Sequence, residues 1–138
     1  MRYISLLLAS IVAVVLCQGD AKACFCGLPD FSQSIKSAKT IFSGKVIEAS
    51  PERVVFEIDE VWKGQLKEKF TLSVNGSSCD VYFNVGETYL VYALKDKDWL
   101  SGEDRWHTHL CTRTRKIAEA KEDIDRLWTL KLSKLKRL

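Results

Sequence analysis

Two cysteines separated by one residue, Cys24 and Cys26, stand where an apolar N-terminal segment ends. Arg2 is followed by an apolar run of about 13 residues, and small residues occupy the positions three and one before Cys24. This order of charge, apolar run and small-x-small site is typical of a cleaved signal peptide. The run is also too short to span a bilayer comfortably. We therefore predict that residues 1–23 are removed by cleavage after Ala23, which gives Cys24 a free α-amine and makes the protein secreted.

The cysteine count predicts disulfides. Cys17 lies inside the predicted signal, so the mature chain keeps four cysteines, which are Cys24, Cys26, Cys79 and Cys111. An even number in an exported chain indicates a disulfide framework. A bridge between Cys24 and Cys26 would close a very small, strained ring. Cys24 therefore pairs with Cys79 or with Cys111, and Cys26 takes the other partner. Either arrangement ties the start of the mature chain to distant segments.

Length and composition exclude several classes of function. The mature chain of 115 residues is one small domain, and its net charge is about +2. A near-neutral, exported, disulfide-bonded chain gives no basis for nucleic-acid binding. The sequence contains no Ser-His-Asp set, no paired carboxylates in a pocket context and no phosphate loop. We therefore expect a monomeric protein that is not an enzyme and has no cofactor.

The apolar pattern predicts a mainly β fold. Asp30 is a plausible N-cap for a short helix over 31–38. Period-two alternation then predicts strands over 41–48, 54–62, 70–74, 88–94 and 106–112, the last containing Cys111. Gly44 suggests a bend or bulge in the first strand. The strand over 88–94 is apolar on both faces and is expected to be central.

The rest of the chain is predicted as one loop and one helix. Residues 95–104 are polar and charged, which indicates a long loop. Apolar residues recur at helical spacing from about residue 115 to residue 138. Five short strands followed by one helix favour a disulfide-stapled, five-stranded OB-fold β-barrel with a short N-terminal helix and a C-terminal helix.

Several short motifs, taken in order, resemble one family. They are Cys24-Phe25-Cys26, Phe42-x-Gly44-Lys45-Val46, Val61-Trp62-Lys63-Gly64, Ser77-Ser78-Cys79, Gly86-Glu87-Thr88-Tyr89-Leu90-Val91 and Cys111-x-Arg113. This set resembles the N-terminal domain of the tissue inhibitors of metalloproteinases, an OB-fold of the wider netrin-like group. The resemblance covers nearly all of the mature chain, from Cys24 to about Leu127.

The resemblance implies a disulfide pairing and a mechanism. It pairs Cys24 with Cys79 and Cys26 with Cys111. It also implies that the α-amine and backbone carbonyl of Cys24 chelate the catalytic zinc of a target protease and displace its water. Phe25 then enters the pocket beside the metal. Ser77 and Ser78 form the adjoining part of the contact surface. A zinc protease keeps one coordination position open, and a neutral amine is a good ligand for it.

A second interpretation needs no protease. Netrin-like domains in other proteins share the barrel and the bridges without inhibiting proteases. Phe25 stands where the inhibitors usually have a small or polar residue, and Pro29 is shifted by one position. Both departures favour a non-inhibitory binding module that recognises a surface protein or an envelope polymer.

Other residues have competing interpretations. His107, His109 and Cys111 alternate and, with Cys24 and Cys26, have the residue types of an intrinsic metal site. Oxidised cysteines cannot ligate, however, so we expect surface histidines. The spacing of Cys24 and Cys26 is also unlike that of a catalytic dithiol. The basic and apolar residues 131–138 can in principle touch an anionic membrane. We expect instead a helix end with solvated lysines.

Overall fold

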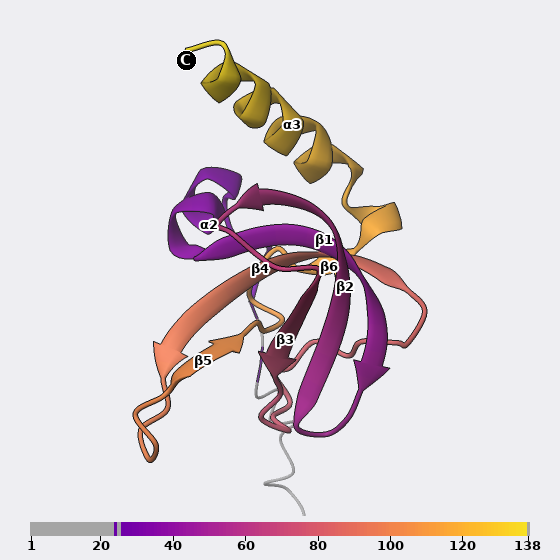
Figure 1. Cartoon of the computed structure of the whole chain (residues 1–138), viewed down its shortest axis with the longest axis vertical. Coiled ribbons are helices and arrows are strands. Elements are labelled where there is room, and N and C mark those ends of the chain that lie inside the picture. Colours follow the sequence, from indigo (N-terminus) through magenta and orange to yellow (C-terminus); the bar gives the residue numbers. More distant parts are fainter. Residues whose placement is uncertain (1–23, 25, 138) are drawn as a thin grey trace, which may run out of the picture.

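The computed structural model describes residue 24 and residues 26–137 of the chain. Its strands are β1 (Thr40–Ala49), β2 (Arg53–Lys63), β3 (Lys69–Ser73), β4 (Thr88–Lys97), β5 (Asp104–His107) and the short β6 (Arg115–Lys116). Its helices are α2 (Phe31–Ser37), the 3₁₀ turn η1 (Ile117–Glu119) and α3 (Lys121–Leu135). Figure 1 shows the five longer strands curled into a half-barrel, with α2 and α3 outside it. The predicted mainly β class, with a helix near each end and two disulfides, is confirmed.

The strand order is that of an OB-type barrel. Every pairing is antiparallel, and the order across the sheet is β3-β2-β1-β4-β5, with β6 paired to β4. The sheet curls so that the two end strands of this order meet through side chains. The rings of Phe70 on β3 and Trp106 on β5 lie 5.3 Å apart between centroids. A five-stranded, partly open barrel of this kind buries its inner face without complete closure.

The barrel interior is filled by the alternating apolar side chains that the sequence predicts. Phe42, Val46, Phe56, Leu72, Tyr89 and Val91 are among its buried members. Gly44 lies where the β1–β2 register shifts, as predicted. A Cβ atom at this position would lie 2.8 Å from the carbonyl oxygen of Glu57, so only glycine allows the two strands to approach this closely.

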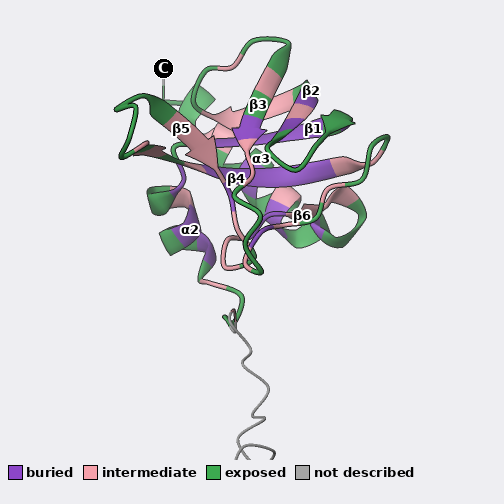
Figure 2. Ribbon diagram, turned by 90° about the horizontal axis from the view of Figure 1, so that it is seen from below, coloured by how far each residue is buried: buried purple, intermediate pink, exposed green. Residues whose placement is uncertain are grey.

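The helices cover the outer face of the sheet around a second apolar cluster (Figure 2). Its buried members are Phe31, Ala38, Ile41, Leu90, Tyr92, Ala120 and Leu127. The carboxylate of Asp30 accepts hydrogen bonds from the backbone N–H groups of Ser32 and Gln33, so it caps α2 as predicted. Because β4 carries apolar residues on both faces, it serves both clusters, which confirms its central position.

Three predicted boundaries are wrong. The predicted loop over 95–104 is shorter and spans 98–103, because β4 extends to Lys97 and β5 begins at Asp104, whose carboxylate pairs across the hairpin with Lys95 and Lys97. The fifth strand ends at His107 rather than at residue 112, because Thr108 turns its hydroxyl back to the Tyr92 carbonyl. The C-terminal helix begins at Lys121 rather than near residue 115, since β6 first pairs with β4.

Within residue 24 and residues 26–137, no helix is long and apolar enough to cross a membrane. The predicted signal peptide, residues 1–23, lies outside the described residues, as does Phe25.

Candidate functional site

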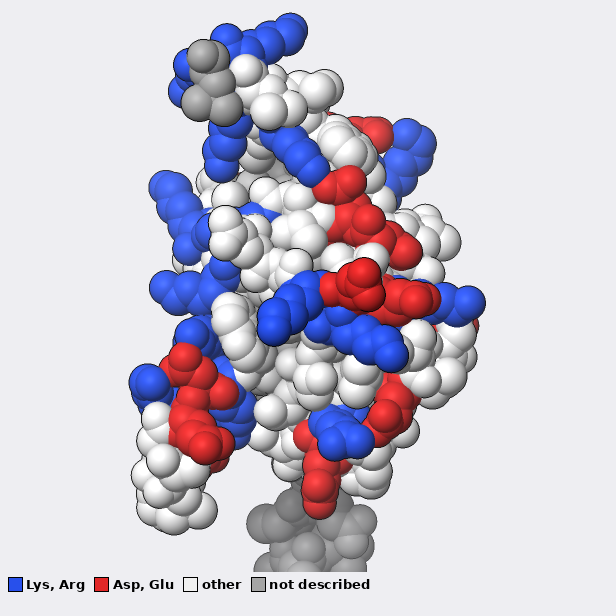
Figure 3. All heavy atoms as spheres, viewed as in Figure 1, with Lys and Arg blue, Asp and Glu red and all other residues white. Residues whose placement is uncertain are grey.

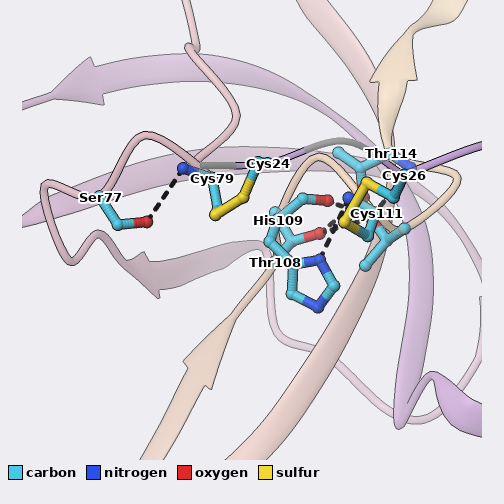
Figure 4. Close-up of a disulfide and its surroundings, with 9 residues drawn as sticks. Cys24, Cys26, Ser77, Cys79, Thr108, His109, Cys111 and Thr114 are labelled. Carbon is cyan, nitrogen blue, oxygen red and sulfur yellow. Dashed lines mark hydrogen bonds between the residues drawn. A yellow bond between two sulfur atoms is a disulfide. The ribbon is translucent and has the colours of Figure 1, made fainter. Parts of the chain in front are cut away.

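Two disulfides fix the start of the described chain to two loops. Cys24 is bonded to Cys79 and Cys26 to Cys111, with Cα atoms 5.4 Å apart in each bridge. This is the pairing that the resemblance implies. Figure 4 shows the two bridges near one another, with the ring of His109 between them. The disulfides indicate an oxidising environment of the extracellular type.

The loop that carries Cys79 is shaped by one buried carboxylate. Asp80 accepts hydrogen bonds from the backbone N–H groups of Asn75 (3.2 Å) and Ser77 (2.9 Å). The hydroxyl of Ser77 in turn accepts from the N–H of Cys79 at 3.1 Å (Figure 4). Short polar side chains that satisfy nearby backbone donors hold turns of this kind. The side chains of Ser77 and Ser78 therefore stay exposed on an ordered loop.

The second loop, 108–112, is bonded to the first. The N–H of Leu110 donates to the carbonyl oxygen of Cys79 at 2.8 Å. The N–H of Cys111 donates to Nδ1 of His109 at 3.2 Å. The hydroxyls of Thr108 and Thr114 lie 2.8 Å apart, deep under the loop. Both disulfides thus end in loops that are joined by a backbone hydrogen bond, which limits movement of one bridge relative to the other.

A third anchor holds the segment that follows the cysteines. Arg113 donates from Nη1 to the carbonyl oxygen of Pro29 at 2.6 Å. Its Nε and Nη2 bind the two carboxylate oxygens of Asp123 at 2.8 and 2.5 Å. Arg115 and the hydroxyl of Tyr92 also contact Asp123, at 2.9 and 3.0 Å. The N-terminal segment is therefore tied to the first turn of α3.

The carboxylate of Asp123 is wholly buried and is paired with the guanidinium groups of Arg113 and Arg115. Burial alone would raise its pKa, but the hydrogen bonds from Arg113 and Tyr92 and the charges of both arginines outweigh burial and lower it. Burial and the adjacent carboxylate raise the pKa of Tyr92. A buried charge survives only when it is paired and hydrogen-bonded, and this one is satisfied from three sides.

Polar side chains from the 75–80 loop, β5 and the 108–112 loop border the disulfide-bonded terminus. Cys24 is half-buried and lines a groove of about 370 Å³ together with Asn75, Ser77, Arg105, His107 and His109, among others. Of the residues predicted to contact a protease, Cys24 and Ser77 line this groove together, and Ser78 is exposed next to Ser77 on the same loop. The position of Phe25 is outside the described residues.

The alternative metal site is not assembled from the predicted residues. Cys24, Cys26 and Cys111 are consumed in disulfides, so their sulfurs cannot ligate. The rings of His107 and His109 stack with centroids 6.3 Å apart. Burial, and then the charge of His107, lower the pKa of His109. Residue 24 and residues 26–137 contain no group of three His, Cys, Asp or Glu side chains placed to hold a metal.

The pairing of Arg113 with Asp123 was missed at the sequence level, although both residues carry a signal. Arg113 belongs to the Cys111-x-Arg113 motif, but the spacing of that motif does not indicate which group the arginine binds. Asp123 stands among the apolar residues that α3 turns inward. A charged residue at such a position needs a buried partner, but sequence does not say which.

In comparisons with known proteins, no family model matches the chain and no curated protein is similar to it in sequence.

Proposed function

We propose that the chain is an exported inhibitor of zinc metalloendopeptidases, similar in mechanism to the tissue inhibitors of metalloproteinases. After removal of residues 1–23, the α-amine and carbonyl oxygen of Cys24 bind the zinc of a target enzyme. Phe25 enters the pocket beside the metal, and Ser77 and Ser78 contact the rim of the cleft. The zinc belongs to the protease and not to this chain.

One observation carries the proposal: the residue that would bind zinc is pinned to the barrel before any partner arrives. The Cys24–Cys79 bridge, the Cys26–Cys111 bridge and the bond from Arg113 to the Pro29 carbonyl hold this segment at three successive points. A terminus that is already ordered loses little conformational entropy when it binds. The ordered loop at 75–80 adds a second, equally fixed contact.

The chemistry of the terminus suits a protease zinc. A catalytic zinc holds three protein ligands and one exchangeable water. An α-amine has a pKa near 8, so a substantial fraction is neutral at working pH and free to coordinate. Chelation by an amine and its own carbonyl replaces the water that would attack the substrate.

The test compares the exported protein that begins at Cys24 with the same protein carrying one extra N-terminal alanine. Both are assayed against a panel of zinc endopeptidases with a fluorogenic peptide. The added residue moves the amine away from Cys24 and leaves the barrel and bridges intact. We expect inhibition by the first form and a loss of at least about 100-fold in the second, as for removal of a central contact.

Thermal melts of the two forms serve as the control for folding and should superimpose. A Phe25→Ala variant, which keeps the amine, should weaken inhibition without abolishing chelation. Equal inhibition by the native and extended forms would sink the chelation mechanism, and so would a lack of inhibition by either form across the panel.

A non-inhibitory binding module is the second candidate, and one surface favours it. Tyr82 is 81% exposed and Val85 61% exposed on the segment that follows Cys79. Exposed aromatic and aliphatic side chains of this kind serve protein contacts that need no free amine. This candidate expects no protease inhibition from either form, so the same assay distinguishes the two.

A further inference from the structure

The second half of α3 is a cationic segment. Together with the two residues that follow the helix, this half spans 128–137 and contains four basic and no acidic residues, namely Lys131, Lys134, Lys136 and Arg137. The helix extends past the barrel in Figure 1, and Figure 3 shows Lys and Arg side chains at this end of the molecule. The disulfide-bonded segment lies toward the other end of the long axis. Any partner of the helix end therefore leaves the Cys24 edge accessible.

An exposed apolar stripe runs along the same half-helix. Trp128, Leu132 and Leu135 are spaced four and three residues apart, which places them on one side of a helix. Their exposed fractions are 39, 54 and 59%. Trp128 makes a T-shaped contact with Trp62 on β2, with ring centroids 6.0 Å apart. Exposed leucines at this density are costly in water, so the stripe points to a surface that covers it.

Other elements add cations beside the helix. The ammonium of Lys63 on β2 is held by the carbonyl oxygens of Ile35 and Ala38. Burial, then the neighbouring charges of Lys39 and Lys134, lower its pKa, so both of these lysines lie close enough to act on Lys63. Lys131 is the exception, because its charge is paired with Glu60. The excess of positive charge is therefore shared by the α2–β1 connection, β2 and α3.

We propose that this half of α3 binds the surface of an anionic phospholipid bilayer. The helix lies in the plane of the interface. Trp128, Leu132 and Leu135 enter the headgroup region, while Lys134 and Lys136 meet lipid phosphates. A helix with lysines on its polar side and Trp and Leu on the other is suited to this position.

A second copy of the chain fits the surface poorly. Three side chains form an apolar area far below that of a stable dimer interface. Two copies facing each other would also place like charges in apposition. A purely polar anionic polymer matches the lysines but leaves the leucines in water. The bilayer is the occupant that satisfies both the charge and the apolar stripe.

The experiment is co-sedimentation of the exported, disulfide-bonded protein with vesicles. One set contains equal parts phosphatidylglycerol and phosphatidylcholine, and the other contains phosphatidylcholine alone. We expect binding to the anionic vesicles only, and release as NaCl rises from 50 to 300 mM. The double substitution K134Q/K136Q should weaken binding roughly 30-fold, and L132S/L135S should abolish it.

Matched controls separate this surface from general charge and hydrophobicity. K67Q/K69Q removes the same charge from exposed lysines around the start of β3, and Tyr82→Ser removes an exposed apolar side chain elsewhere. Both should bind like the native protein. Equal binding to neutral vesicles, no binding to either set, or equal losses in the controls would overturn the proposal. Sedimentation equilibrium showing a dimer that L132S/L135S dissociates, without vesicle binding, would also overturn it in favour of a second copy.

Discussion

The two halves of α3 belong to one continuous helix but differ in what holds them. In the first half, Asp123 and Leu127 are buried, the former against Arg113 and Arg115 and the latter in the apolar cluster under α2. In the second half, Leu132 and Leu135 are more than half exposed. The first half of α3 is therefore packed into the domain, and the second half presents exposed side chains.

The difference gives the two halves of α3 separate roles, namely support of the N-terminal segment and an exposed contact surface. Asp123 fixes Arg113, and Arg113 holds the carbonyl of Pro29, three residues after Cys26. The first half of α3 thus supports the terminus on which the proposed inhibition depends. The second half contributes little to that support, so its composition is free to serve another contact. Substitutions should consequently have unequal effects in the two halves.

The largest effect is expected from Asp123→Asn. This change leaves the buried Arg113 and the partly buried Arg115 without a countercharge, and removal of one partner of a buried ion pair typically costs about 3–5 kcal/mol. Asp125→Asn on the same helix is the matched control. Its partner Lys121 is exposed, so the cost should be under about 0.5 kcal/mol. Urea unfolding of both variants measures the free energies.

The pH dependence provides a second check on Asp123. Its pKa in the folded state is lowered. The stability that it contributes is therefore complete above the unfolded pKa of about 3.9 and is lost as pH falls through the folded value. The gap between the native protein and D123N should close in acid, because a protonated Asp resembles Asn. A gap that stays constant down to pH 2 would contradict this account.

The sequence predicted the elements but only part of the difference between the two halves of α3. Period-two alternation located β1 to β4, and the helical spacing of Ile124, Leu127 and Leu135 located α3, because one-sided burial leaves a local pattern. The pattern does not show that Leu127 is covered and Leu135 is not, since coverage depends on where α2 and β2 lie. The partners of Asp123 are equally non-local.

At the candidate site, the identity of the residues was more informative than their hydrophobic periodicity. Cysteines in an exported chain must find partners, so residue type alone assigned Cys24 and Cys26 to distant segments. The hydrogen bond from Leu110 to Cys79 and the role of Asp80 in shaping the 75–80 loop had no such signal. They arise from backbone groups that come together only after folding.

The next effect in size is that of C26S/C111S. Loss of a native disulfide that closes a long loop should cost about 3 kcal/mol, in line with a sequence separation of 85 residues. The loosening should be local: hydrogen exchange is expected to rise over 26–30 and 108–112 and to stay unchanged over 128–137. Faster exchange along the whole of α3 would show that the second half depends on the pinned terminus after all.

A leucine pair compares the two halves of α3 directly. Leu127→Ala should cost about 2 kcal/mol, because it opens a cavity beneath the helix. Leu132→Ala should change stability by less than about 0.5 kcal/mol, since its side chain is exposed. Thermal or urea unfolding of the two variants gives the ratio. Equal costs would mean that the second half is packed in solution and would remove the basis for the exposed stripe.

The smallest effect concerns protons at the pinned terminus. Burial, and then the charge of His107, lower the pKa of His109, and its Nδ1 accepts the N–H of Cys111. The stability from neutral His109 is therefore complete above about pH 6.5 and is lost as pH falls through the lowered value. His109→Asn supplies a comparable acceptor that does not titrate, so the unfolding midpoint of this variant should decline less between pH 7.5 and 5.

The helix end is the internal control for this experiment. Residues 126–137 contain only Lys and Arg as ionisable side chains, so hydrogen-exchange protection there should stay constant over this range. Identical slopes for the native protein and H109N would show that the histidine does not support the loop.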